Sequence, residues 1–599
     1  MSRIIGEKIQ RVKKTVEKLH IRQSNDSPNG TLTRQYGFIK FNENELDETT
    51  RVAQYIHLAL ATDAETVVKF MKDAWHLRTP DLIISIAGST QHFDLSARLK
   101  KSFQLGLVSA AATTNAWIIT AGINAGVVKE VGEALSKYRY KNQKDGIDIP
   151  CIGIASWDYI AGKDQLDQSI SKTSNNHNTI VNTPSKKYQH NIAIDAIQMS
   201  GDAIYGIRTY IVKQKEENKC DLEPNHTHFL LFDDGTSNSE NLLPLRTDIE
   251  MHSRYTNIKE TIEGAVHTLI PIVMVLVEGG RSSIQHVCKA LDLNTPVVIV
   301  KESGHAADLI ADLHACFSED DIDYVTDNNN EDSKRSSRSS FVKTGLLIVK
   351  INAIFAKARI HNPWVDDVRD DLCQRLDKCH KLITIFKFDS KLYHGKLEES
   401  ILEAVFNAAK ISHGSNEQYR SAAELKLALA WHNVEYARRA IFTDLSILKW
   451  RGEDLRQALL DALRRGYVDF IELFLEYGIT LEKLTIRDLE YLYISASIDK
   501  VLPLRKIRYT LPTRDEFYAE YMGNHLKIYN ETNIPLGDHA IRDLFIWAIF
   551  LDRFDFALYL CSKTWNQSVA PLFGAQIYRK AAAMTLDSET KQQYEKNAK

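Results

Sequence analysis

The chain has 599 residues, of which 44% are hydrophobic and 26% charged, so its composition excludes a protein that is disordered throughout. The length predicts about four domain-sized units, and the 27 glycines and 13 prolines are too few for a fibrous or turn-rich all-β protein, so we expect an α or α/β fold. Lysine plus arginine (75) and aspartate plus glutamate (78) nearly balance, giving a net charge of −3, which argues against nucleic acid as a partner.

Residues 1–45 are predicted to be an N-terminal helix and lead-in. Residues 1–20 (MSRIIGEKIQRVKKTVEKLH) place apolar side chains at spacings of three and four among charges, which indicates an amphipathic helix and not a secretory signal. The longest apolar runs, 269–277 and 544–551, are far shorter than the ~20 residues of a membrane helix, so we expect no membrane span in this chain. The seven cysteines form no CxxC pair; we therefore predict a reducing, cytoplasmic location, with no metal site and no cofactor.

Between residues 46 and 320, short apolar runs alternate with helical patterns. The predicted strands are 81–87 (DLIISIA), 116–120 (AWIIT), 149–155 (IPCIGIA), 228–233 (HFLLFD), 271–277 (PIVMVLV) and 296–300 (PVVIV). Amphipathic stretches such as 96–114 and 126–138 lie between them. This alternation is typical of a parallel sheet covered by helices on both faces. We predict an α/β, Rossmann-like doubly wound sheet with a polar insertion loop at 161–190.

Loops of small or glycine residues follow five of these strands. They are AGST (87–90), AGINAG (121–126), DDGTSN (233–238), EGG (278–280) and ESG (302–304). The carboxyl ends of parallel strands form the edge where such sheets bind ligands, and glycine lets a phosphate approach the main chain. Each glycine alone is explained as well by a tight turn, but five aligned loops favour a nucleotide-type crevice.

The second half of the chain has helical periodicity. Residues 319–342 combine an acidic block, an asparagine run and a basic serine cluster, so we predict that the first domain ends at 320 and that 321–342 is a disordered linker. From 343 to 599 we predict an all-α helical-repeat, ankyrin-like array, because 427–442, 455–479 and 544–561 each resemble two helices joined by a turn. Gly466 is the predicted joint of the second pair.

Taken together, these motifs resemble a known family. DLIISIAG, NAWIITAG, NHTHFLLFDDGT, LPLRT, PIVMVLVEGG and TPVVIVKESG occur in the order seen in the N-terminal melastatin homology region of TRPM-type transient receptor potential cation channels. NHTHFLLFDDGT and LPLRT are most similar to the ADP-ribose-gated members. The resemblance covers nearly the whole chain outside the insertion and the linker. It implies a first domain of the SLOG type, followed by stacked helix pairs that pack between subunits.

The resemblance also implies a ligand, ADP-ribose or a related nucleotide, over the strand ends. Its phosphates would contact two glycine-rich loops and two arginines, of which Arg246 in LPLRT matches the first and would make a charge-assisted, bidentate contact. The implied ligand-binding residues are Thr120, Gly122, Asn124, Gly126, Thr236, Arg246, Gly279, Gly280, Ser283, Ser303, Gly304 and His305.

This chain departs from the family pattern at several of these positions. His305 stands where the family has the second arginine, which replaces a permanent charge with a ring that is mostly neutral at pH 7. Ala121 and Ala125 replace a glycine and a hydroxyl-bearing residue, and the loop after Thr236 lacks an expected tyrosine, while Arg281 could restore positive charge. Two hypotheses stay open: a site that still binds nucleotide, and a degenerate scaffold that conveys conformational change between subunits.

The function implied by the resemblance is that of a cytosolic ligand-sensing and assembly region of a calcium-permeable cation channel, homotetrameric when joined to a pore. The alternative is a free-standing, pore-less protein that modulates channel subunits. SLOG relatives also include nucleotide hydrolases whose PGGxGTxxE loop supplies a glutamate, but EGGRSSIQH here has Gln285 near that position. We therefore predict no enzymatic activity and no catalytic residues.

Overall fold

The computed structural model describes most of the chain. The described residues are 2–19, 36–41, 52–89, 95–138, 149–166, 207–211, 216, 218–233, 239–255, 269–326, 336–360, 362–388, 396–412, 417–442, 450, 452–494, 502, 539–564, 570–585 and 588–599. The chain divides into two compact units, one formed by 1–255 and 269–414 and one that includes 415–599.

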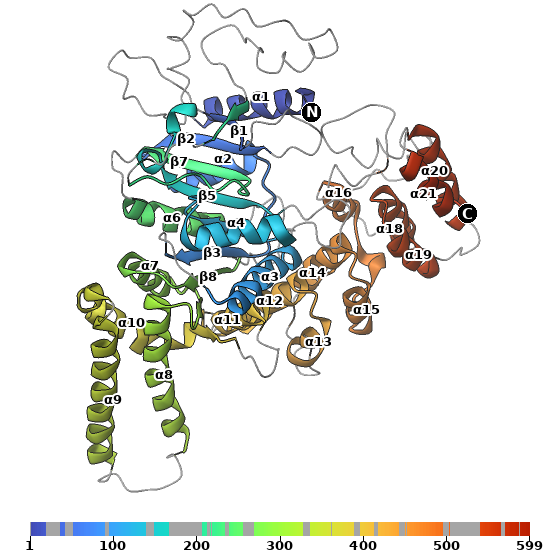
Figure 1. Cartoon of the computed structure of the whole chain (residues 1–599). Helices are drawn as coiled ribbons and strands as arrows, with labels where there is room; N and C mark the ends of the chain where they lie inside the picture. Colours follow the sequence, from blue (N-terminus) through green and yellow to red (C-terminus); the bar gives the residue numbers. More distant parts are fainter. Residues whose placement is uncertain are drawn as a thin grey trace, which may run out of the picture. The chain divides into compact units, whose positions relative to one another are not determined.

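The first unit is built on a ten-stranded sheet (Figure 1). Its strands are β1 (Tyr36–Lys40), β2 (Ala53–Ala59), β3 (Ile83–Gly88), β4 (Trp117–Thr120), β5 (Cys151–Ser156), β6 (Ile207–Thr209), β7 (His228–Asp233), β8 (Ile272–Val277), β9 (Val297–Val300) and β10 (Ile383–Phe386). Their order is β10-β9-β8-β3-β4-β5-β7-β2-β1-β6. Among the described strands, β1 and β2 pair antiparallel and the other neighbours pair parallel. All six predicted strands are confirmed.

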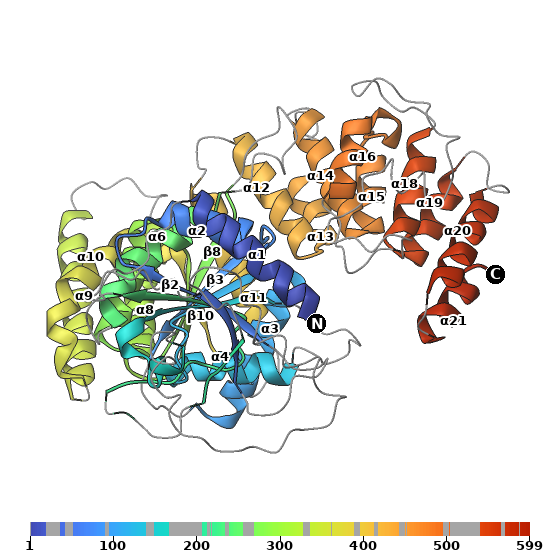
Figure 2. The ribbon, with the colours of Figure 1, turned by 90° about the horizontal axis from the view of Figure 1, so that it is seen from above.

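Helices cover both faces of this sheet, which confirms the predicted α/β, doubly wound architecture. The helices of this unit, of which α9 and α10 pack mainly on other helices, are α1 (Ser2–Lys18), α2 (Ala64–Asp73), α3 (Ala97–Thr113), α4 (Gly126–Tyr138), α6 (Leu243–Ser253), α7 (Arg281–Asp292), α8 (His305–Thr326), α9 (Ser336–Arg359), α10 (Arg369–Cys379) and α11 (Leu397–Ser412). Figure 2 shows α2 and α6 on one side of the sheet and α3 and α4 on the other. Because successive strand residues point to opposite faces, Leu230 and Phe232 pack toward α2 and α6 while Phe229 and Leu231 enter a separate cluster.

The boundary of the first unit differs from the predicted one. β10 pairs in parallel with β9, from Ile383 opposite Val297 to Phe386 opposite Val300, and the unit extends to Gly414. The prediction of purely helical structure from residue 343 is therefore wrong at 383–386, because a four-residue apolar run cannot be distinguished from helical periodicity. The predicted linker also overlaps helix, since α8 ends at Thr326 and α9 begins at Ser336. Of the predicted insertion loop, only 161–166 lie within the described residues.

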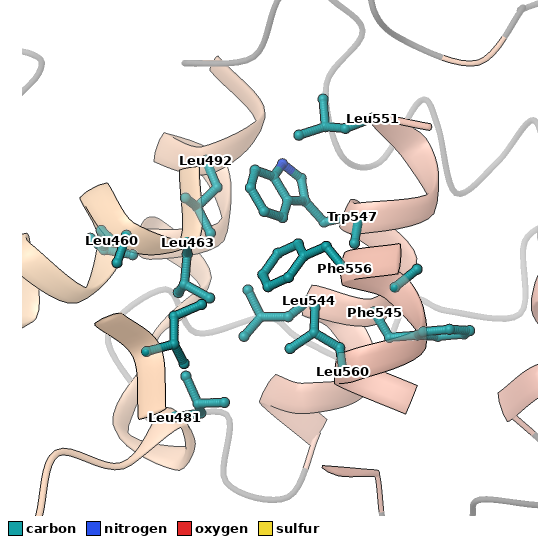
Figure 3. Packing of buried hydrophobic residues seen from close by; sticks show 14 of the residues in the cluster. Leu460, Leu463, Leu481, Leu492, Leu544, Phe545, Trp547, Leu551, Phe556 and Leu560 are labelled. Carbon is teal, nitrogen blue, oxygen red and sulfur yellow. The ribbon is translucent and has the colours of Figure 1, made fainter. Parts of the chain in front are cut away.

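The second unit consists of helices among its described residues. They are α12 (Glu417–Ala430), α13 (Val434–Tyr436), a π-helical turn (Ala437–Ile441), α14 (Gly452–Arg465), α15 (Val468–Glu476), α16 (Ile486–Ile494), α18 (His539–Phe550), α19 (Phe554–Lys563), α20 (Ala570–Met584) and α21 (Ser588–Asn597). The predicted joint at Gly466 is confirmed: its φ of 76° ends α14, and α15 follows. Figure 3 shows Trp547 and Phe556 pointing from the α18–α19 pair toward Leu463 and Leu492, so neighbouring pairs share one core.

None of the helices in the described part of the chain combines the length and the hydropathy that a bilayer crossing requires.

Candidate functional site

The sheet has a topological switch point between β3 and β8. From β3 the chain places β4, β5 and β7 successively to one side, and then returns to place β8 and β9 on the other side. These strands run parallel, so their carboxyl ends lie at the same edge. Ligands of such sheets bind beyond the carboxyl ends at the switch point, where the loops of the two flanking strands diverge.

The helix α7 begins beside this switch point. It follows β8 directly, with Gly280 before its first turn, and the Ser283 hydroxyl donates to the carbonyl of Gly88 at the end of β3 (3.3 Å). The first turn of α4 lies against the same loop, because Val127 N donates to Ser89 O (3.1 Å). The N-termini of α4 and α7 therefore meet at the loop that follows β3. Unpaired amides and the helix dipole make such a place favourable for an anion.

A third helix, α8, begins on the other side of the β8 loop. Ala306 N donates to Gly279 O (3.1 Å), and Ala307 N donates to Glu278 O (2.9 Å). The Ser303 hydroxyl accepts from Glu278 N (2.7 Å) and donates to Val300 O (2.6 Å). The loops after β8 and β9 are thus fixed to each other, and three helix N-termini surround the switch point.

Two glycines of the β8 loop have different roles. Gly279 has a φ of 89°, and a Cβ there would lie 2.7 Å from the Ser283 side chain, so local packing alone requires glycine. At Gly280 a Cβ would meet no atom of the described residues within 4 Å, and its φ of −117° suits any residue. The small size of Gly280 is therefore not explained by packing, and it leaves open space in front of α7.

Arg246 lies beneath this edge, in α6, with only 7% of its side chain exposed. Its Nε donates to Glu250 Oε1 (2.9 Å), and its Nη2 donates to the Ser85 hydroxyl (2.9 Å) and to the carbonyls of Ile86 (2.9 Å) and Ile119 (3.1 Å). The guanidinium thereby holds together the ends of β3 and β4. Two of its three nitrogens, Nε and Nη2, already donate to acceptors within the protein. These bonds do not favour a bidentate contact with a phosphate, which stays a prediction.

The Ser85 hydroxyl completes this network by donating to Glu250 Oε1 (2.6 Å). His286 of α7 lies near Arg246. Burial lowers the pKa of the His286 ring well below its ordinary value, and the charge of Arg246 lowers it further. A neutral His286 beside a cationic Arg246 is the less costly arrangement in a buried site. The positive charge of Arg246 beneath the strand ends is thus compensated chiefly by Glu250.

Thr120 ends β4 and is fully buried. Its hydroxyl lies 2.7 Å from His226 Nε2 and accepts from Gly122 N (2.8 Å), while His226 Nδ1 lies 2.7 Å from Glu223 Oε2. Burial opposes protonation of His226, but its contacts with Cys151 and Glu223 outweigh burial and raise its pKa to about 10. The relay Glu223–His226–Thr120 supports the loop from below, and neither Thr120 nor His226 reaches solvent.

The loop from Gly122 to Gly126 is also fixed by its main chain. Asn124 N donates to Asp221 O (2.7 Å), and Glu223 N donates to Gly122 O (3.0 Å). Gly126 then begins α4. The structure therefore places Thr120, Gly122 and Asn124 beside the segment at 221–226, whereas Gly126 starts the helix that reaches the loop after β3.

His305 begins α8 with a strained φ of 39°. Its Nδ1 lies 2.6 Å from Asn362 Oδ1, and its Nε2 lies 3.6 Å from Glu278 Oε1. Gly304 precedes it, and a Cβ there would contact the Glu278 side chain at 3.5 Å. The predicted residues Gly279, Gly280, Ser283, Ser303, Gly304 and His305 therefore do come together, around the end of β8. Thr236 lies outside the described residues.

Glu278 is the functional candidate that the sequence analysis missed. It is non-glycine with a φ of 55°, and only 11% of its side chain is exposed. Burial raises the pKa of its carboxyl, against the opposing effects of a hydrogen bond with Ser89, the nearby His305 and the Gly279 amide. A strained, buried acid at a ligand edge is typical of functional sites. Its sequence signal was an acidic residue at a strand end, directly before two glycines.

Metal binding finds no support in the part of the chain that the structure describes, where no group of three or more His, Cys, Asp or Glu side chains is arranged to hold an ion. The His228 ring centroid lies 4.7 Å from that of Trp75, and His228 Nε2 lies 3.2 Å from Gln54 Nε2.

Residues 53–196 and 195–344 match the family model described as SLOG in TRPM. The chain is 30% identical over 436 residues to transient receptor potential cation channel subfamily M member 2 of Rattus norvegicus, which covers 72% of this chain and 25% of that protein. It is 30% identical over 472 residues to subfamily M member 6 of Mus musculus (77% and 19%). It is 29% identical over 470 residues to the transient receptor potential cation channel trpm of Drosophila melanogaster (77% and 20%). The chain spans a quarter or less of the length of these relatives.

Proposed function

Because the chain belongs to the TRPM family through the SLOG domain at 53–344, we propose that it is a cytoplasmic ligand-sensing and assembly region of a TRPM-type cation channel. In this proposal the crevice at the β3–β8 switch point binds ADP-ribose or a related nucleotide. The helical unit, arranged as an ankyrin-like array, joins channel subunits into a homotetramer.

One observation carries the ligand proposal: the N-termini of α4, α7 and α8 surround a switch point where Gly280 leaves open space. A diphosphate placed there would be attracted by the three helix dipoles and would receive first-turn amides of α7, since Val127 N, Ala306 N and Ala307 N already donate to carbonyls of the protein. Arg281 supports the same placement, because it begins α7, is 54% exposed and pairs only with the equally exposed Asp367 at 3.3 Å among the described residues. Such a surface pair is weak enough to exchange its partner for a phosphate.

The altered ligand shell sets the expected affinity. His305 replaces an arginine and Arg246 is engaged by Glu250, so up to two charged hydrogen bonds are lost, each worth roughly 1.5–3 kcal/mol. Binding weaker by a factor of about 100 or more is therefore expected in comparison with a site that keeps both arginines. The titration must accordingly extend to millimolar ligand.

The test is isothermal titration of the full chain with ADP-ribose, using Gly280→Val to fill the open space. Gly452→Val is the matched control, because a Cβ at that helix start in the other unit also meets no atom within 4 Å. We expect binding by the wild type and by Gly452→Val, and a loss of at least tenfold in Gly280→Val. No heat and no thermal shift for the wild type would refute ligand binding and favour the scaffold hypothesis.

Assembly is tested separately by the native mass of the chain, alone and mixed with a full-length channel subunit. Its relatives are channel subunits by name, and the helical unit exposes Leu558 (53%), Leu572 (69%) and Phe573 (45%), apolar side chains that a protein partner could cover. Failure to co-purify with channel subunits would count against assembly. Co-purification as a separate polypeptide would instead favour the free-standing modulator.

A further inference from the structure

Glu278 contacts all three loops that surround the switch point. Its carboxyl interacts with Ser89 after β3, with the Gly279 amide after β8 and with His305 after β9. The main chain is held in the left-handed region at this residue, a conformation that costs a non-glycine residue about 1 kcal/mol or more. The fold therefore keeps a carboxylate at the centre of an edge that otherwise suits anions.

One oxygen of this carboxylate has no hydrogen-bond partner among the described residues. In the described part of the chain, Glu278 Oε2 is buried and accepts no hydrogen bond, and the whole residue is only 8% exposed. Buried polar atoms in proteins are nearly always paired, so such an oxygen marks a place for a missing donor. The donor must enter among Ser89, the Gly279 amide and His305, which surround this carboxyl.

The neighbouring imidazole does not supply this donor. His305 Nδ1 faces the carbonyl oxygen of Asn362 at 2.6 Å, and the same amide donates its Nδ2 to Ala358 O at 3.3 Å, so Nδ1 carries the proton. Its Nε2 faces the other carboxylate oxygen, Glu278 Oε1, at 3.6 Å and not Oε2. Glu278 Oε2 therefore remains an acceptor position for a hydroxyl or N–H group of a ligand.

We propose that Glu278 is the specificity-determining residue of the crevice and selects a ligand that presents a sugar hydroxyl pair beside its phosphates, as a nucleoside diphosphate sugar does. This inference rests on the proposed nucleotide binding. The helix N-termini attract the phosphates, whereas the carboxylate repels a phosphate that lacks an accompanying donor. Glu278 therefore distinguishes a ribose-bearing diphosphate from inorganic pyrophosphate.

The test compares ADP-ribose with inorganic pyrophosphate by isothermal titration of the full chain and of Glu278→Gln. Loss of the charged acceptor should weaken ADP-ribose binding about tenfold or more, while removal of a like charge should leave pyrophosphate binding unchanged or strengthen it a few-fold. Glu302→Gln is the matched control, because Glu302 is an exposed acid with a similar φ of 68° in the adjacent loop. It should change neither affinity.

If Glu278 has a purely structural role, Glu278→Gln should change the affinities for ADP-ribose and pyrophosphate in the same direction. That result would overturn the inference, and so would an unchanged affinity for ADP-ribose. Neither result would contradict nucleotide binding itself. Binding of neither ligand by the wild type overturns the proposed function and this inference with it. Should Glu278→Gln fail to fold, Glu278→Asp retracts the carboxyl but keeps its charge. We expect Glu278→Asp to weaken ADP-ribose binding without strengthening pyrophosphate binding, and equal losses for both ligands would again overturn the inference.

Discussion

Replacing Gly132 by alanine would place a methyl group against a buried carboxylate. Gly132 lies in α4, and a Cβ there would be 1.9 Å from Glu223 Oε1 and 2.0 Å from the Glu223 Cδ. Atoms do not approach so closely, so either the helix or the carboxylate must move. The change therefore tests whether the relay Glu223–His226–Thr120 is a fixed part of the core.

The carboxylate cannot move at low cost. Glu223 is 2% exposed, accepts from Asn225 N (2.9 Å) and Asn225 Nδ2 (2.8 Å), and pairs with His226 Nδ1 (2.7 Å). Overpacking costs about 1–3 kcal/mol, and a buried donor left unpaired costs about 1–3 kcal/mol more. The higher helix propensity of alanine returns about 1 kcal/mol. We expect Gly132→Ala to lower the free energy of unfolding of the first unit by about 2–4 kcal/mol.

Hydrogen exchange of the full chain measures this effect locally, because the two units need not unfold together. Peptides from β4 and β7, which carry Thr120 and follow His226, should exchange roughly 30-fold to 1000-fold faster in Gly132→Ala. Peptides from α14 in the helical unit should not change.

The Glu223→Ala background provides the decisive control. Without the carboxylate, an alanine at 132 has room, so Gly132→Ala should then be neutral or stabilise the first unit by up to about 1 kcal/mol. An equal cost of Gly132→Ala in both backgrounds would show that the helix itself, and not the Glu223 carboxylate, resists the added methyl group.

Two further predictions concern other buried charges. Burial, assisted by the charge of Lys8, lowers the pKa of His228 to about 3, so below pH 6.5 the unfolded chain binds a proton at this ring while the folded unit does not. The free energy of unfolding should therefore fall by on the order of 4 kcal/mol between pH 6.5 and 3. If His228 is responsible, the stability measured by hydrogen exchange should depend less steeply on pH in His228→Gln. In the helical unit, Arg456 binds both carboxylate oxygens of Asp488, which is 1% exposed, so Arg456→Met should lower the free energy of unfolding in urea by about 2 kcal/mol. Arg439 is 82% exposed, so Arg439→Met should leave the urea midpoint unchanged. Equal midpoints for the two variants would show that the buried ion pair does not stabilise the unit.

The sequence was sufficient to predict the central sheet because its strands are runs of branched apolar residues bounded by glycine. It was not sufficient for β10, since Ile383–Phe386 is four residues long and lies among helical patterns. A short apolar segment becomes a strand only if it pairs with the edge of a sheet. Here that edge is β9, which lies more than 80 positions earlier in the chain.

The candidate site could be predicted in part. Six of the predicted residues come together around the end of β8 because loops at parallel strand ends share one edge. Arg246 lies beneath this edge, but the i, i+4 spacing in LPLRTDIE pairs it with Glu250 in α6, so its contact with a ligand stays a prediction. The unpaired oxygen of Glu278 could not be foreseen, because it results from three loops distant in the sequence.

The late arrival of β10 has a consequence for synthesis and truncation. During translation, Val297–Val300 emerges well before Ile383–Phe386, and until then this fully buried, β-branched strand presents a bare lateral edge to other nascent chains. A recombinant fragment cut at residue 344, where the SLOG match ends, would keep that edge permanently. Soluble expression of this unit accordingly requires a terminus beyond Gly414.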